Sequence, residues 1–247
     1  MAFDSGDCPL DIATPITVTI DQTKLTAPRP ASDRSWQVSL HRADGQWKIG
    51  SVSAEGLRKK HDFQGPIDDA FLDSFIFVRP TGEGRHKAVD QWVNAEFTHA
   101  VEHWRRQFRG EARVKDDKQI QDDDIAKVNL ILFGDPASNA VLARIADKLP
   151  IAWNEKEIVT GKERFGSDNH ALIAIYPNPL NPARYVVLNS SFTYREFAYL
   201  NNARQVPMLP DWAVVDLRTP PDAVWPGKVV AADFFDEQWR LRAASAK

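Results

Sequence analysis

Residues 174–197 read AIYPNPLNPARYVVLNSSFTYREF, two short apolar runs separated by a loop rich in proline and asparagine. The runs, 172–176 and 185–188, contain almost no polar side chains, which is typical of strands buried on both faces. Proline fixes φ and removes a backbone donor, so 176–182 is predicted to form a stiff loop between the strands. The serines after the second run raise a question: the strand ends either in a catalytic nucleophile or in the start of a helix.

The remainder of the second half repeats this alternation of apolar strands and helical patterns. Further apolar runs occur at 74–78, 129–133, 212–217 and 228–232. Helices are predicted at 88–108, 140–148, 192–202 and 236–244, from apolar spacing or from acidic and polar residues at the first turn. Continuous apolar strands that alternate with helices are typical of a sheet covered on both faces. The sequence therefore predicts an α/β fold, with a mostly parallel or mixed sheet and helices on both faces.

The first 60 residues have a different character. Asp44-Gly45 lies between two runs that alternate apolar and polar side chains. An Asp-Gly pair in this position is a strong signal for a β-hairpin. Strands that keep one polar face predict a small antiparallel sheet. The predicted organisation is a β-rich N-terminal segment, 1–60, followed by an α/β domain, 61–247.

Composition argues against several classes of partner. The chain has 247 residues, 43% hydrophobic and 26% charged, as in ordinary globular proteins. The formal net charge is −3 and acids and bases are mixed along the chain, so no nucleic-acid partner is expected. No apolar run approaches the ~20 residues of a membrane helix, so no membrane partner is expected either.

Cysteine content and the first residues bear on the compartment. Cys8 is the single cysteine, so no intrachain disulfide is expected. The opening MAFDSGDCPL lacks the basic and apolar regions of a signal peptide. The localisation is therefore open between the cytoplasm and export after removal of a leader.

Polar side chains follow two predicted strands at their carboxyl ends. Asp135, Ser138 and Asn139 lie in the turn after one strand, and Asn189 follows the other. In open α/β sheets, ligands bind in the crevice at this edge. We therefore predict a small-molecule site made by these four residues and Asn178 of the proline-rich loop. The alternative is that they cap turns and helices.

Ser190 and Ser191 occupy the same predicted edge. A serine nucleophile needs a base, and the nearest histidine in the sequence is His170, with Asp168 beside it. In a parallel sheet His170 would lie at the opposite end, because it precedes its strand. A nucleophile elbow also needs glycine on both sides of the serine, which is missing here. The alternative is that Ser190 or Ser191 is a helix N-cap.

The sequence HAVEH at 99–103 fits H-x-x-E-H, the inverted zinc-protease pattern. His99 and His103 are four residues apart and share a helix face, as two ligands of one zinc ion do. Glu96, three residues before His99 on that side, is the candidate third ligand, and Glu102 is the candidate base of this metal site. The alternative is an amphipathic helix with Trp92, Trp104 and Phe108 in the core. No cofactor is expected. The alternative is a divalent metal ion at these residues.

A family resemblance rests on five phrases of the sequence. They are GPIDDAFLDSFIFVRPTG at 65–82, HWRRQFRG at 103–110, NLILFGDPASNAVLARIADKLPI at 129–151, the whole of 176–217, and VVAADFFDEQW at 229–239. Together they resemble the C-terminal region of large bacterial proteins whose N-terminal region is a prolyl-oligopeptidase-like or esterase-like α/β-hydrolase domain. The resemblance extends from Leu57 to Trp239. The catalytic motif of that domain, G-x-S-x-G, does not occur in this chain, so no catalytic residue is carried over.

These observations predict an accessory, non-catalytic C-terminal module of a bacterial hydrolase, which supports its partner or binds a ligand. The expected partner is an α/β-hydrolase domain or a small molecule. The alternative is a stand-alone hydrolase of ester or lactone bonds, an esterase or lactonase. In that case Ser190 attacks with His170 as base, or a metal held by His99 and His103 activates water.

Overall fold

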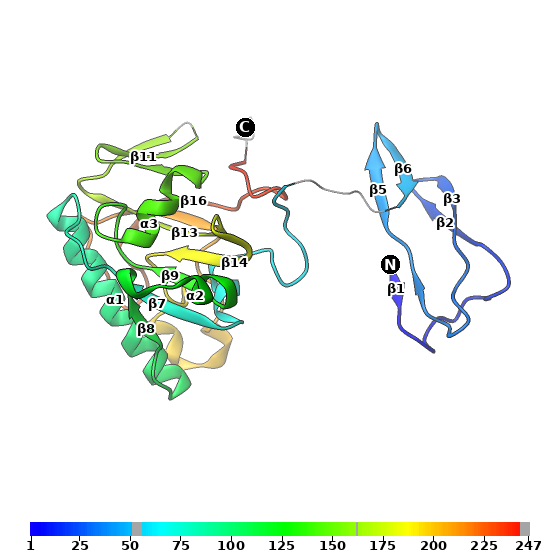
Figure 1. The fold of residues 1–247 in the computed structure, drawn as a ribbon, viewed down its shortest axis with the longest axis horizontal. Helices are drawn as coiled ribbons and strands as arrows, with labels where there is room; N and C mark the ends of the chain where they lie inside the picture. The colour runs from blue at the N-terminus through cyan, green and yellow to red at the C-terminus, as the bar shows by residue number, and fades with distance from the viewer. Residues whose placement is uncertain (51–55, 162, 243–247) are drawn as a thin grey trace. The chain divides into compact units, whose positions relative to one another are not determined.

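The computed structural model describes residues 1–50, 56–161 and 163–242. The chain divides into two compact units, Met1–Glu55 and Gly56–Lys247 (Figure 1). Each unit has a hydrophobic core built from its own residues.

The first unit consists of three short antiparallel strand pairs. They are β1 (Ala2–Phe3) with β4 (Trp36–Gln37), β2 (Ile16–Ile20) with β3 (Thr23–Ala27), and β5 (Leu40–Ala43) with β6 (Gln46–Ile49). The hairpin predicted around Asp44-Gly45 is present, and both residues have positive φ, 52° and 78°. Two positive φ values in a two-residue turn match the twist of the flanking strands. A small core forms around Cys8, Val18 and Trp36.

A seven-stranded mixed sheet forms the centre of the second unit, in the order β16-β15-β13-β14-β9-β7-β8. The bounds are β7 (Phe75–Arg79), β8 (Val114–Asp116), β9 (Asn129–Leu132), β13 (His170–Asn178), β14 (Asn181–Leu188), β15 (Trp212–Asp216) and β16 (Lys228–Asp233). Strands β8, β7, β9 and β14 run parallel. Strand β13 runs antiparallel to β14, β15 antiparallel to β13, and β16 antiparallel to β15. A separate antiparallel sheet contains β10 (Ala152–Trp153), β11 (Glu157–Thr160) and β12 (Glu163–Gly166).

The predicted α/β fold with helices on both faces was wrong. Of the described residues, 22% are helical and 32% lie in strands or bridges. Figure 1 shows one long helix, α1 (Lys87–Phe108), while α2 (Asp122–Lys127) and α3 (Ala140–Ile145) have six residues each. An apolar run indicates that a strand is buried on both faces, but loops can cover it as well as helices, and its direction is not encoded.

The stretch at 174–197 decides the topology, because β13 and β14 form a hairpin. The strands pair antiparallel, with Ala174 opposite Leu188 and Tyr176 opposite Val186. The stiff loop predicted over 176–182 is therefore mostly strand, with a tight turn after Asn178. The Asn178 side-chain oxygen accepts the N–H of Leu180 at 2.9 Å, which closes the turn. This hairpin is where the sheet changes from parallel to antiparallel pairing.

The long helix predicted at 88–108 is confirmed as α1. It packs on the sheet through aromatic side chains, with ring centroids 4.9 Å apart for Trp104 and Phe75 and 5.2 Å apart for Phe97 and Phe133. The helix ends at Arg109, which adopts the left-handed conformation with φ 57°. The helical segment predicted at 140–148 is α3 followed by the 3-10 turn η3 (Ala146–Lys148). Two further 3-10 turns are η1 (Ile67–Phe71), before β7, and η2 (Asp117–Gln119), between β8 and α2.

The helix predicted at 192–202 was wrong. The segment contains two 3-10 turns, η4 (Glu196–Leu200) and η5 (Asn202–Arg204). Its backbone donors bond to distant residues: the Thr193 N–H donates to Asp68, and the Phe197 N–H to the carbonyl of Ala223. These bonds replace the i to i−4 bonds of a helix.

The final helix predicted at 236–244 was also wrong over the described residues. From 236 to 242 the chain forms turns, in which the Asp236 carboxylate accepts the N–H groups of Gln238 and Arg240. Positions 243 and 244 lie outside the described residues.

Candidate functional site

The carboxyl ends of β9 and β14 meet, because the two strands are parallel neighbours. Asn189, directly after β14, accepts the Gly134 N–H at 2.8 Å. Its amide nitrogen donates to the carbonyls of Gly134 at 3.0 Å and Leu172 at 3.1 Å. One buried side chain therefore joins the ends of β9, β14 and β13. Its polar atoms all bond within the fold.

The turn after β9 is held together by the other predicted ligand residues. Asp135 accepts the N–H groups of Ala137 at 2.9 Å and Ser138 at 2.8 Å, and also that of Arg85 at 2.9 Å. Asn139 caps α3, accepting two N–H groups of its first turn at 3.0 and 3.1 Å. The structure thus brings Asp135, Ser138, Asn139 and Asn189 together, in capping roles. Binding of a ligand by these residues stays a prediction.

Asn178 is not part of that group. It ends β13 at the hairpin turn, whereas Asn189 follows β14 at the far end of the same hairpin. The two side chains therefore lie at opposite ends of β14. Asn178 bonds to Leu180 within the turn.

The predicted pair Ser190 and His170 shares an edge of the sheet. The expectation that His170 lies at the opposite end was wrong, because β13 is antiparallel to β14. The Ser190 hydroxyl nevertheless donates to the carbonyl of Ser191 at 2.8 Å, and the His170 Nδ1 lies 2.8 Å from the carbonyl of Gly166. Within the described part of the chain, no hydrogen bond links the two side chains.

The histidines of the H-x-x-E-H sequence lie on the same side of α1, with ring centroids 5.3 Å apart. His99 Nε2 lies 2.9 Å from the Glu196 carboxylate, while both ring nitrogens of His103 are buried without a partner. Burial, followed by the neighbouring His99, lowers the pKa of His103 to about 4. Glu102 points to solvent beside Arg106. Across residues 1–50, 56–161 and 163–242, no three His, Cys, Asp or Glu side chains are grouped to hold a metal ion.

A buried ion pair joins α1 to the residues that follow β14, which we call the 192–208 segment. Arg195 Nη1 donates to Glu96 of α1 at 2.8 Å, and both side chains are buried. Arg195 Nε also donates to the carbonyl of Asp222 at 2.9 Å. The 192–208 segment is thus anchored to α1 on one side and to the 218–225 loop on the other.

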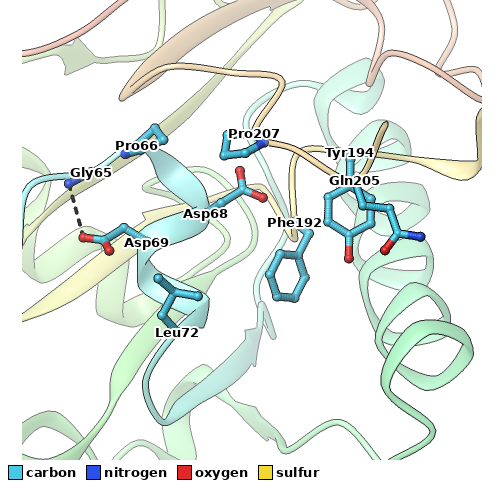
Figure 2. Close-up of a pocket in the computed structure, with 9 residues that line it drawn as sticks. All are labelled: Gly65, Pro66, Asp68, Asp69, Leu72, Phe192, Tyr194, Gln205 and Pro207. Atoms are coloured by element: carbon cyan, nitrogen blue, oxygen red, sulfur yellow. Dashed lines mark hydrogen bonds between the residues drawn. The ribbon is translucent and has the colours of Figure 1, made fainter. Parts of the chain in front are cut away.

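Sequence reasoning missed a pocket of about 360 Å³ between η1 and the 192–208 segment (Figure 2). Its apolar walls are Pro66, Leu72, Phe192, Tyr194 and Pro207. Its polar lining includes Asp68, Asp69 and Gln205. We call this the Asp68 pocket.

Asp68 connects the pocket to the 192–208 segment. Its carboxylate accepts the Thr193 N–H at 3.1 Å and the Thr193 hydroxyl proton. The Thr193 oxygen accepts in turn the N–H of Met208 at 2.7 Å. Burial raises the pKa of Asp68 to about 6, although the Thr193 bonds favour the ionised form.

A second apolar pocket, of about 370 Å³, lies on the other side of residues 205–208. Gln205 and Pro207 line the Asp68 pocket, while Val206 and Met208 line the second one. This alternation is typical of an extended chain with side chains on opposite faces. The second pocket also includes Phe197, Ala198, Ala223 and Val224, with Arg195 and Arg204.

Three residues that line these two pockets are apolar and exposed: Leu72 is 81% exposed, Phe197 50% and Val206 49%. Leu200, in the same 192–208 segment, is 70% exposed. The available sequence signal was a run of aromatic and aliphatic residues after β14 that is followed by Pro207 and Pro210. Such a run favours an irregular apolar surface over a helix.

No protein-family model, curated protein or solved structure matches this chain. Within the described part of the chain, none of the helices has the length and apolar character needed to span a bilayer. The geometry of the site is therefore the basis for the function that we propose.

Proposed function

We propose that this chain is a non-catalytic accessory module that docks on an α/β-hydrolase domain through the 192–208 segment. The observation that carries the proposal is the exposure of three large apolar side chains of this segment, Phe197, Leu200 and Val206, in a segment that lines two pockets. Exposed apolar patches are typical of interaction sites. Aromatic, methionine and arginine side chains, all present here, are enriched in interfaces. The hydrolase partner is the one implied by the sequence resemblance.

The state of the candidate catalytic groups supports a binding role. The Ser190 hydroxyl donates to a neighbouring carbonyl, and His170 faces Gly166. His99 is paired with Glu196, and Glu102 points away to solvent. A nucleophile needs its base within hydrogen-bond reach. These groups instead bond within their own segments or to structural partners.

Docking is tested with the purified α/β-hydrolase domain of one of the large bacterial proteins that the sequence resembles. We expect Phe197→Ser with Leu200→Ser to weaken binding at least tenfold by calorimetry, because exposed aromatic and aliphatic anchors dominate interface energies. Val114→Ser, an exposed apolar residue at the β8 edge, is the matched control and should bind like the wild type. Equal binding by the double variant would place the contact elsewhere.

A second arm tests the absence of catalysis. Hydrolysis of short-chain aryl esters and lactones should remain at background for the wild type, for Ser190→Ala and for the His99→Ala, His103→Ala pair, with or without EDTA. Activity that disappears with Ser190→Ala would establish a serine hydrolase. Activity that disappears with EDTA and with the histidine pair would establish a metal hydrolase.

A further inference from the structure

The Asp68 pocket contains a buried carboxylate without a cation. Asp68 is 8% exposed, and within the described residues it forms no ion pair. Glu96 and Asp211, which are also buried, pair with Arg195 and Lys59. Burying a carboxylate is costly unless it is paired or fully hydrogen-bonded. Asp68 therefore has unused capacity for a positive charge.

Two other buried acids without a cation differ from Asp68 in their bonding. Asp135 accepts three backbone N–H groups, and Asp117 accepts those of Lys118 and Ala140. Asp68 accepts one backbone N–H and one hydroxyl, both from Thr193. Of these three acids, Asp68 alone lines the pocket described above.

The walls of the pocket suit an organic cation. Figure 2 shows the Asp68 carboxylate between Pro207 and Phe192, with the ring of Tyr194 beside Phe192. Aromatic faces attract ammonium and guanidinium groups through the ring quadrupole. Leu72 and the prolines offer apolar contact for an alkyl stem, as methylene stems of basic side chains prefer.

The charge and size of the pocket narrow the ligand further. None of its nine lining residues is basic, and the second charged residue that lines it is the acid Asp69. Asp69 is occupied by the Tyr185 hydroxyl at 2.6 Å and the Gly65 N–H at 3.3 Å. An anion would meet two carboxylates, and a neutral ligand would leave Asp68 without a counter-ion. A volume of about 360 Å³ is near the lower end of ligand pockets, roughly 300–1,000 Å³, and suits one long side chain.

We propose that the Asp68 pocket binds an organic cation with an alkyl stem, such as an arginine or lysine side chain, with Asp68 as counter-ion and Phe192 and Tyr194 as walls. This inference deepens the proposed docking role, on which it rests for its biological meaning. It assigns to the docking partner a basic side chain that enters next to the apolar contact of Phe197 and Leu200.

The test is a titration of the full chain with N-acetyl-arginine methylamide, followed by amide chemical shifts in NMR at pH 7.5. We expect shifts at Phe192, Tyr194 and Gln205, and at least tenfold weaker binding of the neutral isostere N-acetyl-citrulline methylamide. Butylguanidinium, which has no peptide backbone, shows whether the natural ligand is a peptide side chain or a free small molecule. Binding of both cations supports a peptide side chain. Binding of butylguanidinium alone supports a free amine or guanidine.

Two variants and a pH series make the test specific. Asp68→Asn should weaken arginine binding at least tenfold, while Asp73→Asn, an exposed acid that does not line the pocket, should bind like the wild type. Leu72→Ser at the exposed rim should weaken binding with an unchanged fold. Binding should fall about tenfold from pH 7.5 to 5, because a proton competes for Asp68 with a pKa of about 6.

Equal binding of citrulline, or unchanged affinity of Asp68→Asn, would overturn the inference. The outcome is separable from that of the proposed function. Cation binding without docking of the hydrolase domain would keep the pocket assignment and remove the proposed partner. Docking that is unaffected by Asp68→Asn, without cation binding, would remove the pocket assignment alone.

Discussion

At the residue scale, the surroundings of each polar side chain decide its role. Asn189 and Asp135 were predicted to lie at a ligand-binding edge. In the structure their side chains form hydrogen bonds with the backbone of neighbouring turns. Asp68 lies two residues after Pro66 in the sequence. In the structure it is a buried carboxylate in a pocket, held by Thr193, which is 125 residues further along the chain.

Asp68 predicts a specific pH dependence of stability. Its folded pKa of about 6 lies above the ordinary value of 3.8, so the native state holds the proton more tightly than the unfolded state. This contribution to stability is complete below about pH 4 and is lost as the pH rises through 6. The loss is on the order of 3 kcal/mol, since one pKa unit corresponds to about 1.4 kcal/mol.

The measurement is urea unfolding of the wild type and Asp68→Asn at pH 4.5 and pH 7.5. We expect the variant to gain about 2 kcal/mol relative to the wild type between these two pH values, because part of the loss occurs below pH 4.5. Asp73→Asn serves as the control, because the Ser74 N–H and Arg184 lower the pKa of Asp73, which gives its pH dependence the opposite sign. Parallel pH profiles for the wild type and Asp68→Asn would contradict the assignment.

At the element scale, the 192–208 segment is held by side chains rather than by regular secondary structure. Arg195 pairs with Glu96, and Glu196 lies 2.9 Å from His99, so two successive residues bind the same side of α1. Thr193 bonds to Asp68 on the other side. These contacts keep the apolar side chains of the segment at the surface, where the proposed docking takes place.

We expect Arg195→Met to lower the free energy of unfolding by about 3–5 kcal/mol, because it leaves Glu96 buried without its cation. Adding Glu96→Leu should recover part of this loss, because it removes the uncompensated charge. Arg106→Met, which breaks the exposed pair with Glu102 on the same helix, should cost less than about 1 kcal/mol. Urea unfolding gives the three values, and equal costs for Arg195→Met and Arg106→Met would refute the anchoring role.

At the scale of the whole molecule, one long-range ion pair joins residues near the start of the second unit to residues 152 positions further along the chain. Lys59 donates to Asp211 at 2.5 Å, and its ammonium lies 4.9 Å from the centre of the Trp239 ring. Asp211 also accepts the N–H of Phe235 at 2.8 Å. Asp211, directly before β15, therefore connects Lys59 near the start of this unit to the C-terminal turns.

Two fragments test this organisation. A fragment of residues 56–247 keeps Lys59 and the core of the second unit, so its unfolding free energy should match that of the same transition in the full chain within about 1 kcal/mol. A fragment of residues 61–247 loses Lys59 and leaves Asp211 buried without a cation. It should be less stable by at least about 3 kcal/mol.

Lys59→Met in the full chain is the control, and it should reproduce most of the loss seen in the shorter fragment. Denaturant unfolding followed by tryptophan fluorescence measures all four proteins. Equal stability of the two fragments would show that the Lys59–Asp211 pair does not define the boundary of this unit.

Part of the fold and of the site follows from local sequence patterns. The spacing of Trp92, Phe97 and Trp104 predicted α1, the apolar runs predicted β9, β13, β14 and β15, and Asp44-Gly45 predicted a hairpin. The grouping of Asp135, Ser138, Asn139 and Asn189 also followed, because two parallel strands end at the same edge. Each of these signals depends on residues within a few positions of one another or on a single strand pair.

The sequence by itself thus determined the apolar strands of the central sheet, the position of the long helix α1 and the hairpin at Asp44-Gly45. Tertiary structure alone decided strand direction, the loss of the helix at 192–202 and the assembly of the Asp68 pocket. The physical reason is the same for all three. An apolar run has the same energetics in a parallel or antiparallel strand, and the bonds of Thr193 and Arg195 reach partners about 100 residues away. Such contacts exist only after the sheet has formed.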